Sequence, residues 1–287
     1  MEKLQIVTDS AADLKQEEIE EYGIKVAPLK IQFPEGEIRS DSITHDTFYD
    51  RLRQLFPWIP KTSMPSPGEF SLMYDEIDLS GKDTLSIHIS SGLSGTVESA
   101  SLGAKMSGKN VTLVDTKTLS AAQRFQVLAA SKAANAGWSK EAIVQRLAEM
   151  RASSELVFTL ETLDYLKEGG RIGRVSSMLG SVLDLKPIIH VAEDGKYSTV
   201  SKVRSIKKAV LALEDHLVKL YGESTPLWVS IGHGQFAEYA DFIAERLKNS
   251  LHIVNLDVYR VSPVLGVHTG PGILGVGAVP AAMMTGF

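Results

Sequence analysis

The chain contains 287 residues, which is enough for about two domains of ordinary size. Its 30 Lys and Arg residues against 35 Asp and Glu residues give a net charge of −5, which argues against a surface for nucleic acid or anionic membrane. The absence of cysteine excludes disulfides, thiolate metal sites, iron–sulfur clusters and cysteine nucleophiles.

The first residues, Met1–Asp9, lack the basic head and apolar stretch of a signal peptide. No apolar run approaches the ~18 residues needed to span a bilayer. We therefore expect a cytoplasmic protein without stable membrane insertion.

Short β-rich runs alternate with amphipathic stretches in the first half, which is the pattern of βαβ units around a mainly parallel sheet. Apolar positions at helical spacing indicate the helices. We expect strands at Leu4–Val7, Asp83–Ile89 and Asn110–Val114, and helices at Ala11–Tyr22, Thr96–Met106, Leu119–Ala136 and Ser139–Arg151.

A proline-rich stretch interrupts this half between Phe56 and Pro67. Proline fixes its own backbone and donates no hydrogen bond, so the stretch cannot be a regular helix or a central strand. It is predicted to be an ordered loop or an insertion.

The second half opens with a predicted strand, Leu156–Leu160, followed by a glycine-rich basic turn, and we place the domain junction here, giving domains 1–157 and 158–287. Turn residues between two β runs, Lys186–Ala192 and Tyr197–Val203, predict a hairpin. The remaining expected elements are a helix at Ser205–Tyr221, a strand at Leu227–Gly232, a helix at Gln235–Leu247 and a strand at Ile253–Val261. The fold class is therefore α/β, with a mostly parallel sheet covered by helices on both faces in the first domain and a mixed α/β arrangement in the second.

Several motifs of nucleotide and hydrolytic enzymes are missing. The run Gly270–Gly275 matches the dinucleotide pattern letter for letter, but the chain ends at Phe287, before the acidic residue that the pattern requires. There is no P-loop and no nucleophile elbow. The seven histidines lack metal-binding spacing, so we predict no metal site and no catalytic residue.

Hydroxyl-rich loops follow several predicted strands. Ligands bind at the carboxyl ends of parallel strands, and helix starts attract anions. Each hydroxyl taken alone is explained as a helix cap or turn residue. Their clustering, however, suits a carboxyl group held by hydrogen bonds. The loops are Thr8–Ser10, Lys61–Pro67, Ser90–Thr96 and Asp115–Thr116.

Six short motifs follow one another between residue 4 and about residue 280. They are Thr8–Ser10, Thr62–Pro67, Ser91–Thr96, Val114–Thr116, Gly169–Arg171 and His268–Gly272. In series they resemble the signatures of the DegV family of fatty-acid-binding proteins. The family commonly has Gln where this chain has Met64.

The resemblance implies that one long-chain fatty acid lies in an apolar tunnel between two α/β domains, with no cofactor. It implies that the protein is not itself an enzyme and presents the carboxylate to an ATP-dependent fatty acid kinase catalytic subunit, which forms an acyl phosphate. The residues implied to bind the carboxylate are Thr62, Ser63, Ser94, Gly95, Arg171 and His268. The supporting polar residues are Asp9, Ser10, Ser91, Thr96, Asp115, Thr116, Gly170, Thr269 and Gly270.

The residues themselves agree in part, because a chain without a nucleotide loop would need the phosphoryl-transfer machinery of a partner. The apolar segment Ser176–Leu185 is a candidate for the tunnel lining or for ordinary core. A basic segment, with Arg204 foremost and Lys202 and Lys207 beside it, is either a solvated face or a docking patch for the kinase subunit.

Two other functions stay open. One is a hydrolase of an acyl substrate, using Ser94, His268 and an acid such as Asp9. The other is a carrier for a different amphiphile.

Overall fold

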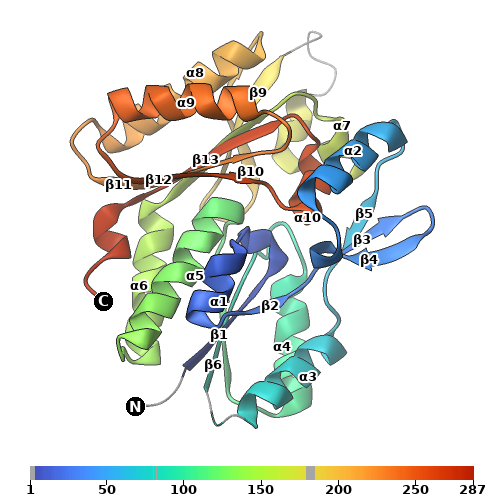
Figure 1. Cartoon of the computed structure of the whole chain (residues 1–287), viewed down its shortest axis with the longest axis vertical. Helices are drawn as coiled ribbons and strands as arrows, with labels where there is room; N and C mark the ends of the chain where they lie inside the picture. The colour runs from blue at the N-terminus through green and yellow to red at the C-terminus, as the bar shows by residue number, and fades with distance from the viewer. Residues whose placement is uncertain (1–3, 80, 82, 179–184) are drawn as a thin grey trace.

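The structure is a computed structural model that describes residues 4–79, 81, 83–178 and 185–287. Two sheets occupy opposite ends of the molecule, and helices cover both faces of each (Figure 1). No described helix is both long and apolar enough to cross a membrane.

The sheet near the N-terminus has four parallel strands in the order β2-β1-β6-β7. Alternate residues of β1 face opposite sides: Val7 packs with α3 and α4, whereas Ile6 packs with α5. Helices therefore cover both faces, as predicted. The strands are β1 (Leu4–Asp9), β2 (Lys25–Ala27), β6 (Asp83–His88) and β7 (Val111–Asp115), and the helices are α3 (Pro67–Asp78), α4 (Thr96–Ser107), α5 (Ser120–Asn135) and α6 (Lys140–Ser153).

The other sheet has six strands in the order β10-β9-β8-β13-β11-β12, parallel only between β11 and β12. Two helices, α8 and α9, cover its outer face. The predicted hairpin is the antiparallel pair β9–β10. The strands are β8 (Glu155–Leu160), β9 (Lys186–Val191), β10 (Tyr197–Val203), β11 (Leu227–His233), β12 (Ile253–Arg260) and β13 (Ile273–Pro280), and the helices are α8 (Ile206–Tyr221) and α9 (Ala237–Ser250).

Helix α5 lies between the two sheets and buries 13 of its 16 residues. Its small side chains permit close packing: a Cβ atom on Gly277 of β13 would lie 2.4 Å from the Cβ of Ala121. One apolar cluster consequently includes residues from both sheets. The proposed boundary between residues 157 and 158 falls inside β8, whose residues all belong to the six-stranded sheet.

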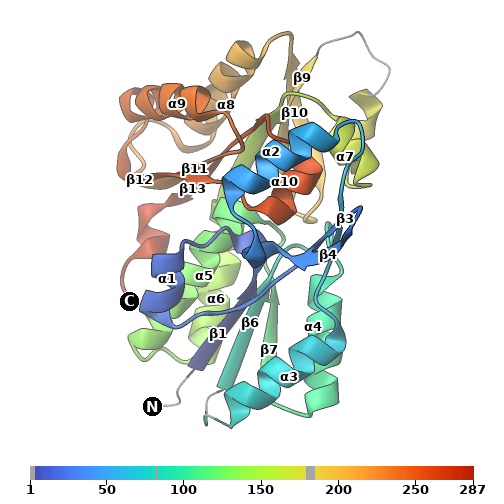
Figure 2. The ribbon, with the colours of Figure 1, turned by 45° about the vertical axis from the view of Figure 1, so that its right-hand side comes forward.

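A small antiparallel sheet, β4-β3-β5, lies beside helices α2 and α10 (Figure 2). The sequence does not predict it, because its strands are only three or four residues long. The proline-rich stretch is ordered as expected, but it contains β5, which is an edge strand and so tolerates prolines nearby. The bounds are β3 (Lys30–Phe33), β4 (Gly36–Arg39), β5 (Lys61–Ser63), α2 (His45–Leu55) and α10 (Pro263–Thr269).

The remaining elements show two further differences from the prediction. The helix expected at Ala11–Tyr22 is split, because Asp13 adopts a left-handed conformation with φ 50° and ends a short 3-10 turn before α1 (Gln16–Tyr22) begins. Helix α7 (Asp164–Glu168) was not predicted. Residues 179–184 of the candidate tunnel lining, Ser176–Leu185, lie outside the described residues.

Candidate functional site

A polar cleft of about 540 Å³ lies where loops of the two halves meet. The loop after β6, the turn after α7 and the start of β10 form its walls. Its charged side chains are Arg171, Arg174 and Lys196, so an anion would be favoured there. The lining residues are Ser91–Gly95, Gly170, Arg171, Gly173, Arg174, Lys196 and Tyr197.

Arg171 links the two halves of the cleft. Its Nη1 donates to the carbonyl of Gly169 at 2.7 Å, and its Nε donates to the carbonyl of Leu93 at 3.4 Å. These bonds use two of the five guanidinium donors. The others are available to an anionic ligand. Arg174, by contrast, pairs with Asp194.

His268 of α10 packs against Gly169, close to the Arg171 turn. Its Nε2 is 2.8 Å from Oγ1 of Thr62, and its Nδ1 is buried without a hydrogen-bond partner in the described part of the chain. A Cβ atom on Gly169 would lie 2.2 Å from that Nδ1, so only glycine leaves room for the ring. Burial, aided by the charge of Arg171, lowers the pKa of His268 to about 3. The ring is therefore neutral at physiological pH.

The other predicted carboxylate ligands lie around the same point. Oγ of Ser94 is 2.8 Å from Oγ1 of Thr96 at the start of α4. The side chain of Met64 covers Gly95, because a Cβ there would lie 2.8 Å from its Sδ. Ser63 instead donates to Glu37 at 2.6 Å, so its hydroxyl already has an acceptor in the small sheet.

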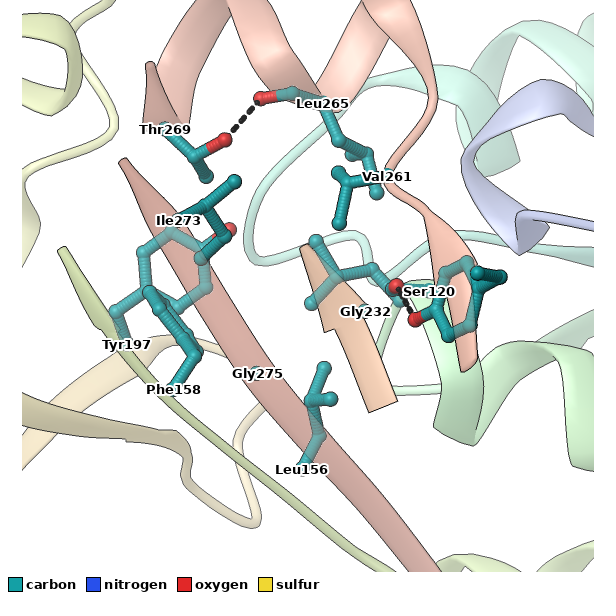
Figure 3. A pocket seen from close by; sticks show the side chains of 12 residues that line it. Ser120, Leu156, Phe158, Tyr197, Gly232, Val261, Leu265, Thr269, Ile273 and Gly275 are labelled. Carbon is teal, nitrogen blue, oxygen red and sulfur yellow. Dashed lines mark hydrogen bonds between the residues drawn. The ribbon is translucent and has the colours of Figure 1, made fainter. Parts of the chain in front are cut away.

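An apolar cavity of about 30 Å³ adjoins these loops (Figure 3). Three of its polar lining groups are hydrogen-bonded: Ser120 with Tyr259 at 2.6 Å, and Thr269 with the carbonyl of Leu265 at 3.0 Å. This volume holds about one water molecule, so a larger ligand needs side chains to move. The lining residues are Leu119, Ser120, Leu156, Phe158, Tyr197, Gly232, Tyr259, Val261, Leu265, Thr269, Ile273 and Gly275.

Tyr197 lines both the polar cleft and the apolar cavity. Its burial raises the pKa of the phenol, so the hydroxyl keeps its proton. The sequence alone does not mark Tyr197, Arg174 or Lys196 as site residues. Their positions are the available signal: Lys196 and Tyr197 are at the predicted hairpin turn, and Arg174 is in the glycine-rich basic turn.

Several supporting residues have local structural partners. Asp9 is fully buried and accepts hydrogen bonds from Nδ1 of His88 and the amide of Ile89, both at 2.9 Å. Ser10 accepts from the amide of Leu29 at 3.0 Å. Thr116 donates to the carbonyl of His88 at 2.8 Å. These contacts are typical of turn and capping residues, which is the alternative that the sequence leaves open for each of these side chains.

The remaining supporting residues border the site. Asp115 accepts from the amide of Ser91 at 3.2 Å and thereby holds one edge of the cleft. Gly170 lines the cleft with φ 70°. Gly270, with φ 75°, packs against the Tyr165 ring.

The chain matches a family model described as uncharacterised protein, DegV family, over residues 3–281. A DegV domain-containing protein of Deinococcus radiodurans is 39% identical over 98% of this chain and 97% of its own length. One from Clostridium acetobutylicum is 34% identical over 96% of this chain and 98% of its own.

Solved structures are similar over nearly the whole chain. A DegV protein of Thermus thermophilus, described for its fatty acid binding, superposes with a TM-score of 0.91 at 31% identity, covering 97% of this chain and 99% of its own. A stearic-acid-binding protein of Eubacterium ventriosum superposes with a TM-score of 0.88 at 29% identity and 98% coverage of each chain.

Proposed function

This chain belongs to the DegV family, and on that premise we propose that it binds a long-chain fatty acid, with the tail in the apolar cavity and the carboxylate in the polar cleft. One observation carries the proposal: Tyr197 lines both spaces, so an apolar cavity and a polar, positively charged cleft lie next to each other. The fatty acids bound by the Thermus and Eubacterium proteins support the same ligand class. No cofactor enters the proposal.

The tail supplies the affinity. Burying a methylene group contributes ~0.8 kcal/mol, so a tail of roughly fifteen contributes ~12 kcal/mol before the costs of association and of opening the cavity. Because the cavity measures only about 30 Å³, opening it is a substantial part of that cost.

The cleft fixes the orientation. Arg171 supplies positive charge, while Thr62 and Ser94 supply hydroxyl donors. His268 is neutral and can donate from one ring nitrogen without adding a second buried charge. Gly95 contributes backbone next to Met64, and Ser63 would have to leave Glu37 to take part.

The direct test is native mass spectrometry of the purified protein, followed by delipidation and reloading. We expect one bound fatty acid of about C14–C20 per chain, recovered after reloading. Protein that is purified without such a lipid and takes none up would contradict the proposal.

We also propose a more specific function, in which the protein presents the carboxylate of its bound fatty acid to a second protein. The bound carboxylate would accept the γ-phosphoryl group of ATP on a separate kinase subunit, giving an acyl phosphate and ADP. Support comes from the position of Ser94, Gly95 and Arg171, three of the proposed carboxylate-binding residues, in the lining of the larger, polar cleft.

The docking surface that we propose for that subunit contains Lys202, Arg204 and Lys207 at the end of β10 and the start of α8. All three side chains are exposed, and none forms an ion pair within the described residues. Reversing Arg204 to Glu is expected to weaken binding of the kinase subunit and leave lipid content unchanged. Lys25→Glu, at an exposed residue of β2, is the matched control. If Arg204→Glu and Lys25→Glu bound the kinase subunit with equal affinity, this surface would not be the docking site.

The geometry does not favour the hydrolase alternative. Asp9 bonds to His88 and not to His268, and the hydroxyl of Ser94 is paired with Thr96. Ser94→Ala separates the two functions, because a carrier loses affinity for the carboxylate whereas a hydrolase loses esterase turnover. A carrier for another amphiphile is tested by displacement with acids and alcohols of matched length.

A further inference from the structure

Three potential metal ligands lie together on the outer face of the six-stranded sheet, away from the lipid cavity. Glu155 is the first residue of β8, His190 is in β9, and His216 is in α8. Their neighbours Leu156 and Phe158 line the cavity from the opposite face, because side chains alternate along a strand. The group is therefore independent of the proposed fatty acid site.

The three side chains converge without forming hydrogen bonds of normal geometry. Nδ1 of His190 is 3.4 Å from Oε1 of Glu155, and Nε2 of His216 is 3.5 Å from Oε2. One ligand atom from each lies within 4.8 Å of the other two. Oε1 of Glu155 and Nε2 of His216 are buried atoms with no hydrogen-bond partner among the described residues. Two polar atoms in one cluster thus lack the partner that burial ordinarily demands.

The distances between the histidine nitrogens and the carboxylate oxygens fit ligands of a shared metal ion better than direct hydrogen bonds. A charge-assisted hydrogen bond between imidazole and carboxylate would be about 2.7–2.9 Å long. Ligands about 2.0–2.1 Å from a tetrahedral ion lie about 3.3–3.4 Å from one another.

We propose that Glu155, His190 and His216 bind one divalent transition metal ion, of which Zn²⁺ fits the donor set best. Two imidazoles and one carboxylate form a set that zinc uses with an open fourth position. The side chains are 13%, 29% and 18% exposed, so water can occupy that position. The ion would connect α8 to β8 and β9. Within the described residues, no other group of His, Cys, Asp or Glu has this arrangement.

The test begins with full-length protein that has been treated with a chelator and dialysed. Zn²⁺ affinity and stoichiometry are measured by competition with a chromophoric chelator, and Co²⁺ is added separately as a spectroscopic probe. We expect one Zn²⁺ per chain, the intense visible bands of four-coordinate Co²⁺, and a higher melting temperature with Zn²⁺. Weak or multiple binding with an octahedral Co²⁺ spectrum would overturn the proposal.

The variants assign the ion to these residues. His190→Ala and His216→Ala are each expected to lower Zn²⁺ affinity by about 100-fold or more, since losing even an outer-shell partner costs about 10–100-fold. Glu155→Gln keeps the shape of the side chain, so it tests the ligand if an alanine variant folds poorly. His252→Ala, at an exposed histidine, is the matched control and should keep wild-type affinity. Equal binding by all four variants would contradict the assignment. Fatty acid content is measured in parallel and should not change.

Discussion

The polar cleft and the apolar cavity are built in different ways. The cleft is formed largely by two short loops, Ser91–Gly95 and Gly170–Arg174, joined by the hydrogen bond from Arg171 to Leu93. The cavity takes one or two side chains from each of many elements, including β8, β11, β12, β13 and α10. The volumes differ as well, at about 540 and 30 Å³.

This contrast separates two kinds of specificity. In the proposed complex, recognition of the head group depends on a few polar side chains in and beside the cleft, so single substitutions should change it without disturbing the fold. Selection of the tail depends on the packing of the whole interface between the sheets, so each change to the cavity also changes stability. The four predictions below test that division, from the largest expected effect to the smallest.

Phe158→Ala should have the largest effect. Phe158 is 4% exposed and packs edge-to-face on Tyr197 at 5.2 Å between ring centroids. Its loss should destabilise the protein by about 3–5 kcal/mol and shift binding toward bulkier or longer tails. Chemical denaturation and chain-length competition measure the two effects. Leu147→Ala, in the core of α6, should cost stability without shifting the preference. If Phe158→Ala kept the wild-type preference for tail length, the cavity would not be the part of the molecule that selects the tail.

Leu156→Phe narrows the cavity from the same strand. A space of about 30 Å³ has little room for the larger side chain, so overpacking should cost about 1–3 kcal/mol. Uptake of long-chain acids should fall sharply, as measured by displacement of a fluorescent fatty acid. Wild-type uptake by a folded variant would show that the tail does not occupy this cavity.

Gly169→Ala tests the polar contacts beside the cleft. Gly169 has φ −71°, which alanine can adopt, but the new Cβ would lie 2.2 Å from Nδ1 of His268 and 2.9 Å from the carbonyl oxygen of Tyr165. It should therefore displace His268 from Thr62 and shift the end of α7. Losing one such hydrogen bond costs about 0.5–1.5 kcal/mol, or about 2- to 10-fold in affinity for a fatty acid.

A fatty alcohol of equal length should bind the Gly169→Ala protein as it binds the wild type. Gly68→Ala in α3 is the control, because its Cβ would meet nothing closer than 3.9 Å. Equal losses for acid and alcohol would mean that the substitution disturbs the cavity too.

The smallest expected effect is the net pH dependence of stability in the wild type, because two buried groups act in opposite directions. The pKa of His268 falls from 6.5 to about 3 on folding, so the unfolded chain binds more protons between these values. Its contribution to stability is complete above pH 6.5 and is lost as pH falls toward 3. Asp13 acts in the opposite direction, because burial raises its pKa from 3.8 to about 6 and its contribution is lost as pH rises through that range.

Denaturation of His268→Gln across this range measures the difference. We expect stability at mildly acidic pH to decline less, relative to neutral pH, than in the wild type. Asp13→Asn removes the group that acts in the opposite direction. The stability of this variant should therefore decline more at acidic pH than that of the wild type. Identical profiles for the two variants would show that neither shift contributes.

Most of the parallel sheet could be predicted from the sequence because its strands are continuous apolar runs between helical patterns. Strand β13 could not, since Gly275 and Gly277 weaken the β signal. The structure gives the reason for one glycine: helix α5 packs so closely that Gly277 has no room for a side chain. That close approach joins the two halves and depends on contacts far apart in sequence.

The part of the candidate site that could be predicted is the part whose residues lie close together in the sequence. The loop at Ser94 and the turn at Arg171 meet in one cleft, whereas Ser10 and Thr116 hold backbone elsewhere. The cavity could not be predicted, because elements such as β11 contribute a single lining residue each. The metal-ligand group also has no local spacing, since its members come from separate elements.

The small volume of the cavity has a kinetic consequence. If the proposed tail occupies this cavity, side chains must separate before it can leave, so we expect its residence time to be set by the opening of the protein and only weakly by the concentration of free lipid. Exchange would then be slow, while the carboxylate in the cleft stays accessible. Such a carrier can let its ligand be modified in place and release it only after the head group has changed.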